Sequence, residues 1–296
     1  MARPSAGPVR AIGGRGVMAA PAAKPRTSTR TRQGAAGAVV EQESPLFIAS
    51  LAKCFQVLEA LNTAARPVGL TELAQLSGLD RSGVQRITHT LRVLGYLRQD
   101  PATKAFRLSG RMLEFGHTVL ATDRVRERAQ PHLEALNRRT GETVNLMELE
   151  GEEIVYVLRY PSLHAVSVDL HVGSRLPAYC TAAGRAILAH MDSAEALARL
   201  KAARRTAMTR FTVTDLAGLR RELEVVHAQG FAVNDQEAFL GDLSVAAPLR
   251  DLHGRPVAAV NIAVPTPRWK LEEVLSKLVP PLVRTAVAID RELRGL

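Results

Sequence analysis

Two short apolar stripes separated by a tight turn dominate residues 69–96. The first stripe covers one face of a short helix that Gly78 interrupts, and its members are Leu70, Leu73, Ala74 and Leu76. The second stripe recurs at intervals of three and four residues, and its members are Val84, Ile87, Leu91 and Leu94. Because this spacing is that of one helical face, and because Asp80 is a favourable N-cap, the pattern predicts two helices joined by a short turn.

Hydrogen-bonding side chains occupy the opposite face of the second predicted helix: Ser82, Gln85, Arg86 and His89. Arginine and glutamine can form bidentate pairs with purine edges, and serine can bond a base or a phosphate. An ordinary solvated face is the competing interpretation. The short turn with its glycine favours a helix-turn-helix unit, in which the second helix lies in the DNA major groove.

The segments on either side extend this unit. An amphipathic helix precedes it, with four apolar residues on one face: Leu51, Phe55, Leu58 and Leu61. A basic hairpin follows, YLRQDPATKAFRLS, in which Asp100-Pro101 signals the turn. Three helices and a two-stranded wing predict a winged helix-turn-helix domain over 44–109. The candidate DNA contacts are Thr71, Arg81, Ser82, Gly83, Gln85, Arg86, His89, Arg98 and Lys104.

Gly83 is unusual early in a recognition helix, since glycine costs about 1 kcal/mol relative to alanine there. It either permits a close approach of the backbone to DNA or is simply tolerated.

Residues 110–122 are too apolar for a free linker and predict a connecting helix of the kind that often forms a dimer seam. A second helix, 124–139, buries four residues and stops at Gly141; the buried residues are Val125, Ala129, Leu133 and Leu136.

The remainder of the chain mixes strands and helices. Strands are expected at 143–149, 153–160, 165–172, 231–235, 244–251 and 256–264, and helices at 181–191, 193–200, 215–229 and 270–293. Val166, Val168, Leu170 and Val172 alternate with polar or small residues, which is typical of a strand with one buried face. This order predicts an α+β domain over 123–296, with an antiparallel sheet covered by helices.

The basic charge is unevenly distributed. The chain of 296 residues carries a net charge of +10, to which residues 1–40 contribute +7, residues 41–43 contribute −2, residues 44–109 contribute +4 and residues 110–296 contribute +1. This concentration is expected of a phosphate-binding footprint, although surplus arginine in the tail could also reflect a GC-rich genome. We expect residues 1–43 to be a disordered tail that adds non-specific DNA affinity, rather than the transit peptide that its composition also resembles.

Other classes of protein find little support. No apolar run reaches the length of a membrane span or a secretory leader, and Cys54 and Cys180 fall in different predicted domains. A reducing cytoplasm, no membrane, no disulfide and no zinc are therefore expected. Glycine-rich phosphate loops, HExxH, Cys-x-x-Cys and G-x-S-x-G patterns are absent, so we expect neither an enzyme nor a cofactor. An enzyme, a non-aromatic metabolite sensor or a purely structural domain fused to the DNA-binding module stay as alternatives.

Several runs carry a resemblance to a known family. SLAKCFQVLEAL and LTELAQLSGLDRSGVQRITHTLRVLGYLRQD resemble the DNA-binding domain of IclR-type transcriptional regulators. EIVYV, GSRLPAYCTAAGRAILA, GFAVNDQE and SVAAPLRDLHGRPVAAVNIAV are similar to the second domain of that family, in the same order and spacing. GSRLPAYCTAAGR is especially similar to the branch that controls aromatic-acid and β-ketoadipate catabolism.

The resemblance implies a winged helix domain, a linker helix and a GAF-like effector-binding domain. It implies three partners: an operator in double-stranded DNA, a small organic acid, and further copies of the chain in dimers or tetramers. RNA polymerase is a further candidate partner. Carried over by position, the effector pocket would include Ala165, Val168, Ala182, Ala183, Gly184, Asn234, Asp242, Ser244, Asn261 and Ala263. The N–H groups at the start of the 181–191 helix would suit a carboxylate.

Two positions depart from the family pattern. Asp242 stands in a Gly-Asp-Leu-Ser run where the family usually has Gly-Leu/Val-Arg, and Gly83 replaces a small β-branched residue or alanine. Asp242 would repel a carboxylate unless it were protonated, turned away or hydrogen-bonded to a ligand hydroxyl.

Overall fold

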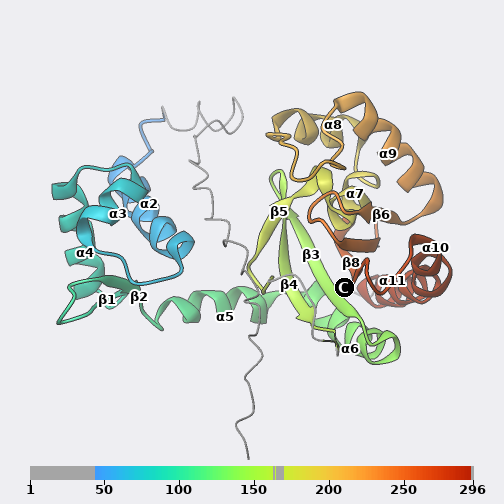
Figure 1. Ribbon diagram of the computed structural model, residues 1–296, viewed down its shortest axis with the longest axis horizontal. Helices are drawn as coiled ribbons and strands as arrows, with labels where there is room; N and C mark the ends of the chain where they lie inside the picture. The colour runs from blue at the N-terminus through green and yellow to red at the C-terminus, as the bar shows by residue number, and fades with distance from the viewer. Residues whose placement is uncertain (1–43, 163, 165–169, 295–296) are drawn as a thin grey trace, which may run out of the picture. The chain divides into compact units, whose positions relative to one another are not determined.

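The computed structural model describes residues 44–162, 164 and 170–294 (Figure 1). The predicted basic tail lies outside these residues. The N-terminal region and the C-terminal region are described separately below. In sequence they are joined by α5 (Met112–Thr122), a helix with no buried residue.

The N-terminal region has three helices and a hairpin. The helices are α2 (Ala49–Ala64), α3 (Leu70–Ser77) and α4 (Arg81–Val93), and the antiparallel strands are β1 (Leu97–Gln99) and β2 (Phe106–Leu108). Gly78 ends α3 with φ +69°, a conformation that glycine adopts without strain, and Asp80 caps α4 by accepting a bond of 2.8 Å from the Gly83 N–H. The predicted winged helix-turn-helix is confirmed.

Part of the predicted apolar packing in this region is wrong. Leu51 and Phe55 of α2 are 54% and 62% exposed, and Leu76 and Leu94 are exposed as well. The buried face of α2 is rotated from the predicted stripe, since Val57, Ala60 and Leu61 make its contacts with the core. The apolar period predicts which residues share a helical face. It does not predict how much of that face a neighbouring element covers.

The C-terminal region is built on a six-stranded antiparallel sheet in the order β5-β4-β3-β8-β7-β6. The strands are β3 (Thr143–Glu150), β4 (Glu153–Tyr160), β5 (Arg175–Pro177), β6 (Ala232–Asp235), β7 (Asp242–Arg250) and β8 (Pro256–Pro265). Its helices are α6 (Arg124–Thr140), α7 (Ala182–Leu188), α8 (Ser193–Ala202), α9 (Leu216–Gln229), α10 (Leu271–Glu273) and α11 (Val279–Leu293). The predicted α+β architecture is confirmed.

Helices cover both faces of this sheet. Leu133 of α6 and Leu282 of α11 pack in one core with Val260 of β8, whereas Ala183 of α7 and Leu219 of α9 pack in a second core on the other face. Successive side chains of a strand point to opposite faces, so β8 contributes Val260 and Ile262 to the first core and Ala259 to the second. The central strands are therefore apolar on both sides.

Some predicted elements differ from the structure by more than a residue or two. Leu170–Val172 are not in a strand, and the rest of the predicted 165–172 strand lies outside the described residues. The 181–191 helix ends at Leu188, and β5 was not predicted. The final helix is divided by a π-helical turn (η2, Val274–Leu278), after which α11 begins with Pro280 in its first turn. Proline is tolerated there because the first N–H groups of a helix have no partner within it.

Candidate functional site

The outward face of α4 presents the predicted recognition residues to solvent. Ser82, Gln85, Arg86 and His89 are exposed, while Val84, Thr88 and Leu91 are buried. Among the described residues, no side-chain hydrogen bond engages Gln85, Arg86 or His89, so their donors and acceptors are available to an incoming duplex. The Ser82 hydroxyl donates to the Asp80 carboxylate over 2.7 Å, which leaves its oxygen as an acceptor.

The structure supplies a local reason for Gly83. A Cβ at this position would lie 2.9 Å from Asp80 Oδ2, the carboxylate that caps α4. Glycine therefore lets the cap close tightly on the first turn of the helix. Gly83 is half-buried, and its role in the cap does not require contact with DNA.

The remaining candidate DNA contacts are all exposed. Arg81 begins α4 and Thr71 lies in the first turn of α3. Arg98 of β1 is paired with Arg107 of β2, and Lys104 lies in the connecting turn with φ +58°. The wing thus places two guanidinium groups side by side, an arrangement suited to phosphate.

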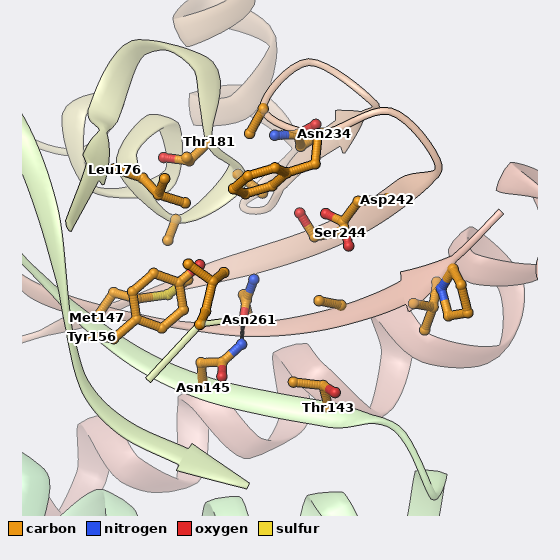
Figure 2. A pocket seen from close by; sticks show the side chains of 18 of the residues that line it. Thr143, Asn145, Met147, Tyr156, Leu176, Thr181, Asn234, Asp242, Ser244 and Asn261 are labelled. Atoms are coloured by element: carbon orange, nitrogen blue, oxygen red, sulfur yellow. Dashed lines mark hydrogen bonds between the residues drawn. The ribbon is translucent and has the colours of Figure 1, made fainter. Parts of the chain in front are cut away.

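A cavity of about 200 Å³ lies in the C-terminal region between the sheet and α7 (Figure 2). Seven of the predicted effector-binding residues line it: Ala182, Ala183, Asn234, Asp242, Ser244, Asn261 and Ala263. Gly184 does not line it, because Gly184 packs on the Ala178 backbone so closely that an added Cβ would lie 2.2 Å from the Ala178 oxygen. Ala165 and Val168 lie outside the described residues.

The start of α7 offers less to an anion than the sequence suggested. This helix has only seven residues, and the Gly184 N–H already donates to Thr181 Oγ1 over 3.2 Å. Thr181, Ala182 and Ala183 contribute a small-residue wall to the cavity instead.

A chain of hydrogen bonds crosses the floor of the cavity. Arg159 Nη1 donates to Asn145 Oδ1 over 3.0 Å. Asn145 Nδ2 in turn donates to Asn261 Oδ1 over 2.7 Å (Figure 2). Because a guanidinium can only donate, Asn145 must accept from it and donate onward, which fixes the orientation of both amides. Asn261 therefore directs its NH₂ group into the cavity, where it can donate to a ligand oxygen.

Arg159 and Tyr156 were missed by the sequence reasoning. The two residues are three apart in β4, so a regular strand would point them to opposite faces. A β-bulge at Val157 changes this: Tyr156 pairs with Met147 and Leu158 pairs with Leu146, which places both Tyr156 and Arg159 on the cavity side. No local signal in the sequence reveals the bulge.

Asp242 is a half-buried carboxyl that lines the same cavity. Burial raises the pKa of Asp242 to about 7, although the positive charge of Arg159 opposes the shift. Among the described residues, none donates a hydrogen bond to its carboxylate oxygens. At neutral pH the cavity therefore contains a carboxyl that exchanges readily between its neutral and charged forms.

An ion pair behind the cavity holds the loop that closes it. Arg185 of α7 is 2% exposed and makes two hydrogen bonds of 2.6 Å to the carboxylate of Glu237. The Glu237 N–H donates to Asn234 Oδ1 over 2.9 Å, and Asn234 Nδ2 donates to the Cys180 carbonyl over 2.7 Å. Asn234 thus positions the 236–241 loop, whose Phe239 lines the cavity.

Within the described ranges, no three His, Cys, Asp or Glu side chains are grouped so that they could hold a metal ion. Of the helices in these ranges, none has the length and hydropathy needed to span a bilayer.

Comparison with known proteins accounts for both regions. The model of the bacterial transcriptional regulator IclR C-terminal domain matches residues 117–291, and the model of the IclR helix-turn-helix domain matches residues 50–101. The Pca regulon regulatory protein of Pseudomonas putida is 34% identical over 252 residues, which are 85% of this chain and 86% of that protein.

Two solved structures share the fold. The IclR protein of Thermotoga maritima is 28% identical with a TM-score of 0.68, over 84% of this chain and 100% of that one. An IclR homologue of Microbacterium hydrocarbonoxydans, solved in complex with 4-hydroxybenzoate, is 26% identical with a TM-score of 0.69, over 83% and 100%. The chain belongs to the IclR family of bacterial transcriptional regulators, and it is a DNA-binding regulator of transcription.

Proposed function

We propose that this regulator binds its operator through α4 and the wing, and that a small aromatic carboxylate in the C-terminal cavity changes that binding. In this mechanism the effector shifts the population between two arrangements of the DNA-binding domains, transmitted through α5. A differential affinity worth ~1–3 kcal/mol would suffice.

The size of the cavity supports a single-ring ligand. Its volume of about 200 Å³ is smaller than the roughly 300–1,000 Å³ of pockets that hold drug-sized molecules. It exceeds the roughly 150 Å³ in which an apolar cavity can hold benzene. Met147, Leu176 and Phe239 supply apolar walls for a ring.

The single observation that carries the proposal is that Arg159 and the oriented amide of Asn261 both line this small cavity, linked to each other through Asn145. A guanidinium has five N–H donors, so it can bind both Asn145 and a carboxylate. Asn261 adds a neutral donor on the same floor. Two relatives point to the same chemistry, since one is a Pca regulon regulator and one was solved with 4-hydroxybenzoate.

Self-association is part of the proposal. Leu113, Phe115 and Val119 of α5 are 75%, 56% and 66% exposed, and Leu51 and Phe55 of α2 are exposed as well. Exposed large apolar side chains gathered on a short helix are characteristic of an interface. A second copy of the chain is the expected partner, because two DNA-binding domains reading two half-sites require a dimer. Light scattering should give a dimer or tetramer, and L113D should lower that mass.

The test is operator binding measured by fluorescence anisotropy on the DNA upstream of the protein's own gene, with and without a panel of aromatic acids and at several salt concentrations. We expect binding that is specific over scrambled DNA and that at least one acid shifts. Specific binding that every acid leaves unchanged would refute the aromatic effector and retain the regulator. In N261L the response should be blunted, and an unchanged response would remove Asn261 from the site.

A further inference from the structure

The cavity has a second polar side that a simple carboxylate would not use. Asp242 and Ser244 lie two residues apart on β7, so they share one face of the strand (Figure 2). Neither the Asp242 carboxyl nor the Ser244 hydroxyl makes a side-chain hydrogen bond to another described residue. Both line the cavity, and both can accept a hydrogen bond from a ligand.

Donors and acceptors are thus supplied by different strands. Arg159 of β4 and the Asn261 amide of β8 donate, whereas Asp242 of β7 adds an acceptor that is charged when ionised. A benzoate-like ligand would satisfy the donors, but its ring would cover the half-buried Asp242 and leave the carboxyl without a partner. A buried polar group left without a hydrogen bond costs free energy, so a ligand that supplies a donor would be favoured over one that does not.

We infer that the effector carries a hydroxyl group in addition to its carboxylate, and that Asp242 is the residue that selects it. This inference rests on the proposed aromatic carboxylate effector and deepens it from a carboxylate to a hydroxyaryl carboxylate. Ser244 assists by offering a hydroxyl that can accept or donate.

A hydroxyl fits this position better than a cationic group. The Arg159 charge already acts on Asp242, so an ammonium group placed against Asp242 would also meet the positive charge of Arg159. A neutral hydroxyl donates to the carboxylate without that repulsion.

If Asp242 selects a hydroxyl, the affinities of carboxylates with and without a hydroxyl group should respond to pH in opposite ways. The other titratable or charged side chains in the described lining of the cavity are Arg159 and Tyr156, both on β4. Burial raises the pKa of Tyr156 further above its usual value, so Tyr156 stays neutral in the physiological range. Between pH 6 and 8 the changing group in the cavity is therefore Asp242, whose pKa is about 7.

As pH rises through 7, Asp242 becomes charged. A ligand with only a carboxylate then meets a like charge, and its affinity falls. A ligand with a hydroxyl can donate to the newly charged carboxylate, and hydrogen bonds to charged groups are the stronger kind. Its affinity should hold or rise over the same interval.

The experiment is isothermal titration calorimetry of the full chain with benzoate, 3-hydroxybenzoate, 4-hydroxybenzoate and 4-aminobenzoate at pH 6 and pH 8. We expect one hydroxybenzoate to bind the wild type at least tenfold more tightly than benzoate at pH 8. In D242L the acids should bind within about twofold of one another. D242N retains an amide oxygen that can accept, so it should keep part of the preference and lose the pH dependence.

The controls separate the possible failures. E272Q removes an exposed carboxylate of α10 and should behave as the wild type. A hydroxyl preference that survives in D242L, or equal binding of benzoate and both hydroxybenzoates by the wild type, overturns the role of Asp242 alone. Tighter binding of 4-aminobenzoate than of either hydroxybenzoate overturns the choice of a hydroxyl. If the wild type binds none of the four acids, the proposed aromatic effector fails and this inference fails with it.

Discussion

The outward face of α4 and the cavity of the C-terminal region are both polar recognition surfaces, but they are held in different ways. On α4, Gln85, Arg86 and His89 extend into solvent and no described side chain fixes them. In the cavity, Arg159, Asn145 and Asn261 form one connected chain inside the fold. The α4 face can therefore be changed at little cost to folding, whereas changes around the cavity affect stability and binding together.

The largest effect should come from breaking the ion pair behind the cavity. E237Q leaves Arg185 without its charged partner in a buried site, which should lower the free energy of unfolding by ~3–5 kcal/mol. Urea denaturation followed by circular dichroism measures this free energy.

Glu222 is the matched control, because it is 3.7 Å from the same guanidinium but its side chain is 47% exposed. E222Q should cost under ~1 kcal/mol. Equal losses in the two variants would contradict the comparison.

The opposite behaviour is expected on α4. R86A should weaken operator binding by ~1–3 kcal/mol and relax one base position, because an exposed arginine on a recognition helix can pair with a guanine edge. Its unfolding free energy should stay within ~0.5 kcal/mol of the wild type. Fluorescence anisotropy on operator and scrambled DNA measures the binding, with R220A on the exposed side of α9 as the control. An equal loss on both DNAs would make Arg86 a phosphate contact.

Replacing Asp242 should change the stability of the protein by a smaller amount, and this change should depend on pH. The folded state raises the pKa of Asp242 to about 7, so this group's contribution to stability is greatest at low pH and is lost as pH rises from about 4 to 7. D242N removes that loss and should be more stable than the wild type at pH 8 by ~1–2 kcal/mol, with the gain shrinking toward pH 4.

Thermal unfolding across this interval measures the difference. Glu148 also has a pKa raised to about 7, chiefly by burial, so the comparison must be between variants and not between pH values alone. A stability gain of the same size at pH 4 and pH 8 would show that the carboxyl charge is not its cause.

The smallest effects should be found on the wing. R98A and K104A each remove one exposed positive charge, so each should reduce the salt dependence of binding by about one unit of slope. Because phosphate contacts carry no sequence information, affinity for operator and scrambled DNA should fall by the same factor. Binding measured over a salt series tests this. A loss confined to the operator would assign the residue to a base contact.

The two surfaces also differ in how far the sequence could predict them. The α4 face lies on one continuous helix, so the helical repeat is enough to assign Arg86 to the exposed face and Leu91 to the buried face. The cavity collects side chains from β3, β4, β6, β7, β8 and α7, which no local pattern brings together. Arg159 reaches it only through the bulge at Val157, which shifts the strand's alternation by one residue.

Other sequence-based interpretations depended on packing that the sequence does not encode locally. The stripe of Leu51 and Phe55 on α2 was recognised as apolar, yet these residues are exposed in the chain. Gly184 was grouped with the effector pocket, but its lack of a side chain is required by contact with the Ala178 backbone. In both cases the residue type indicates a special position, but the sequence does not reveal which group the residue packs against.

The central claim is that the cavity and the operator-binding surface are coupled, and reciprocity tests it directly. The affinity of 4-hydroxybenzoate should be measured by calorimetry for the free protein and for the protein saturated with operator DNA. The account predicts that the affinity changes on operator binding, by the same factor by which the acid changes operator affinity, about 5- to 150-fold. Binding of the acid with one unchanged affinity in the presence and absence of operator would contradict it.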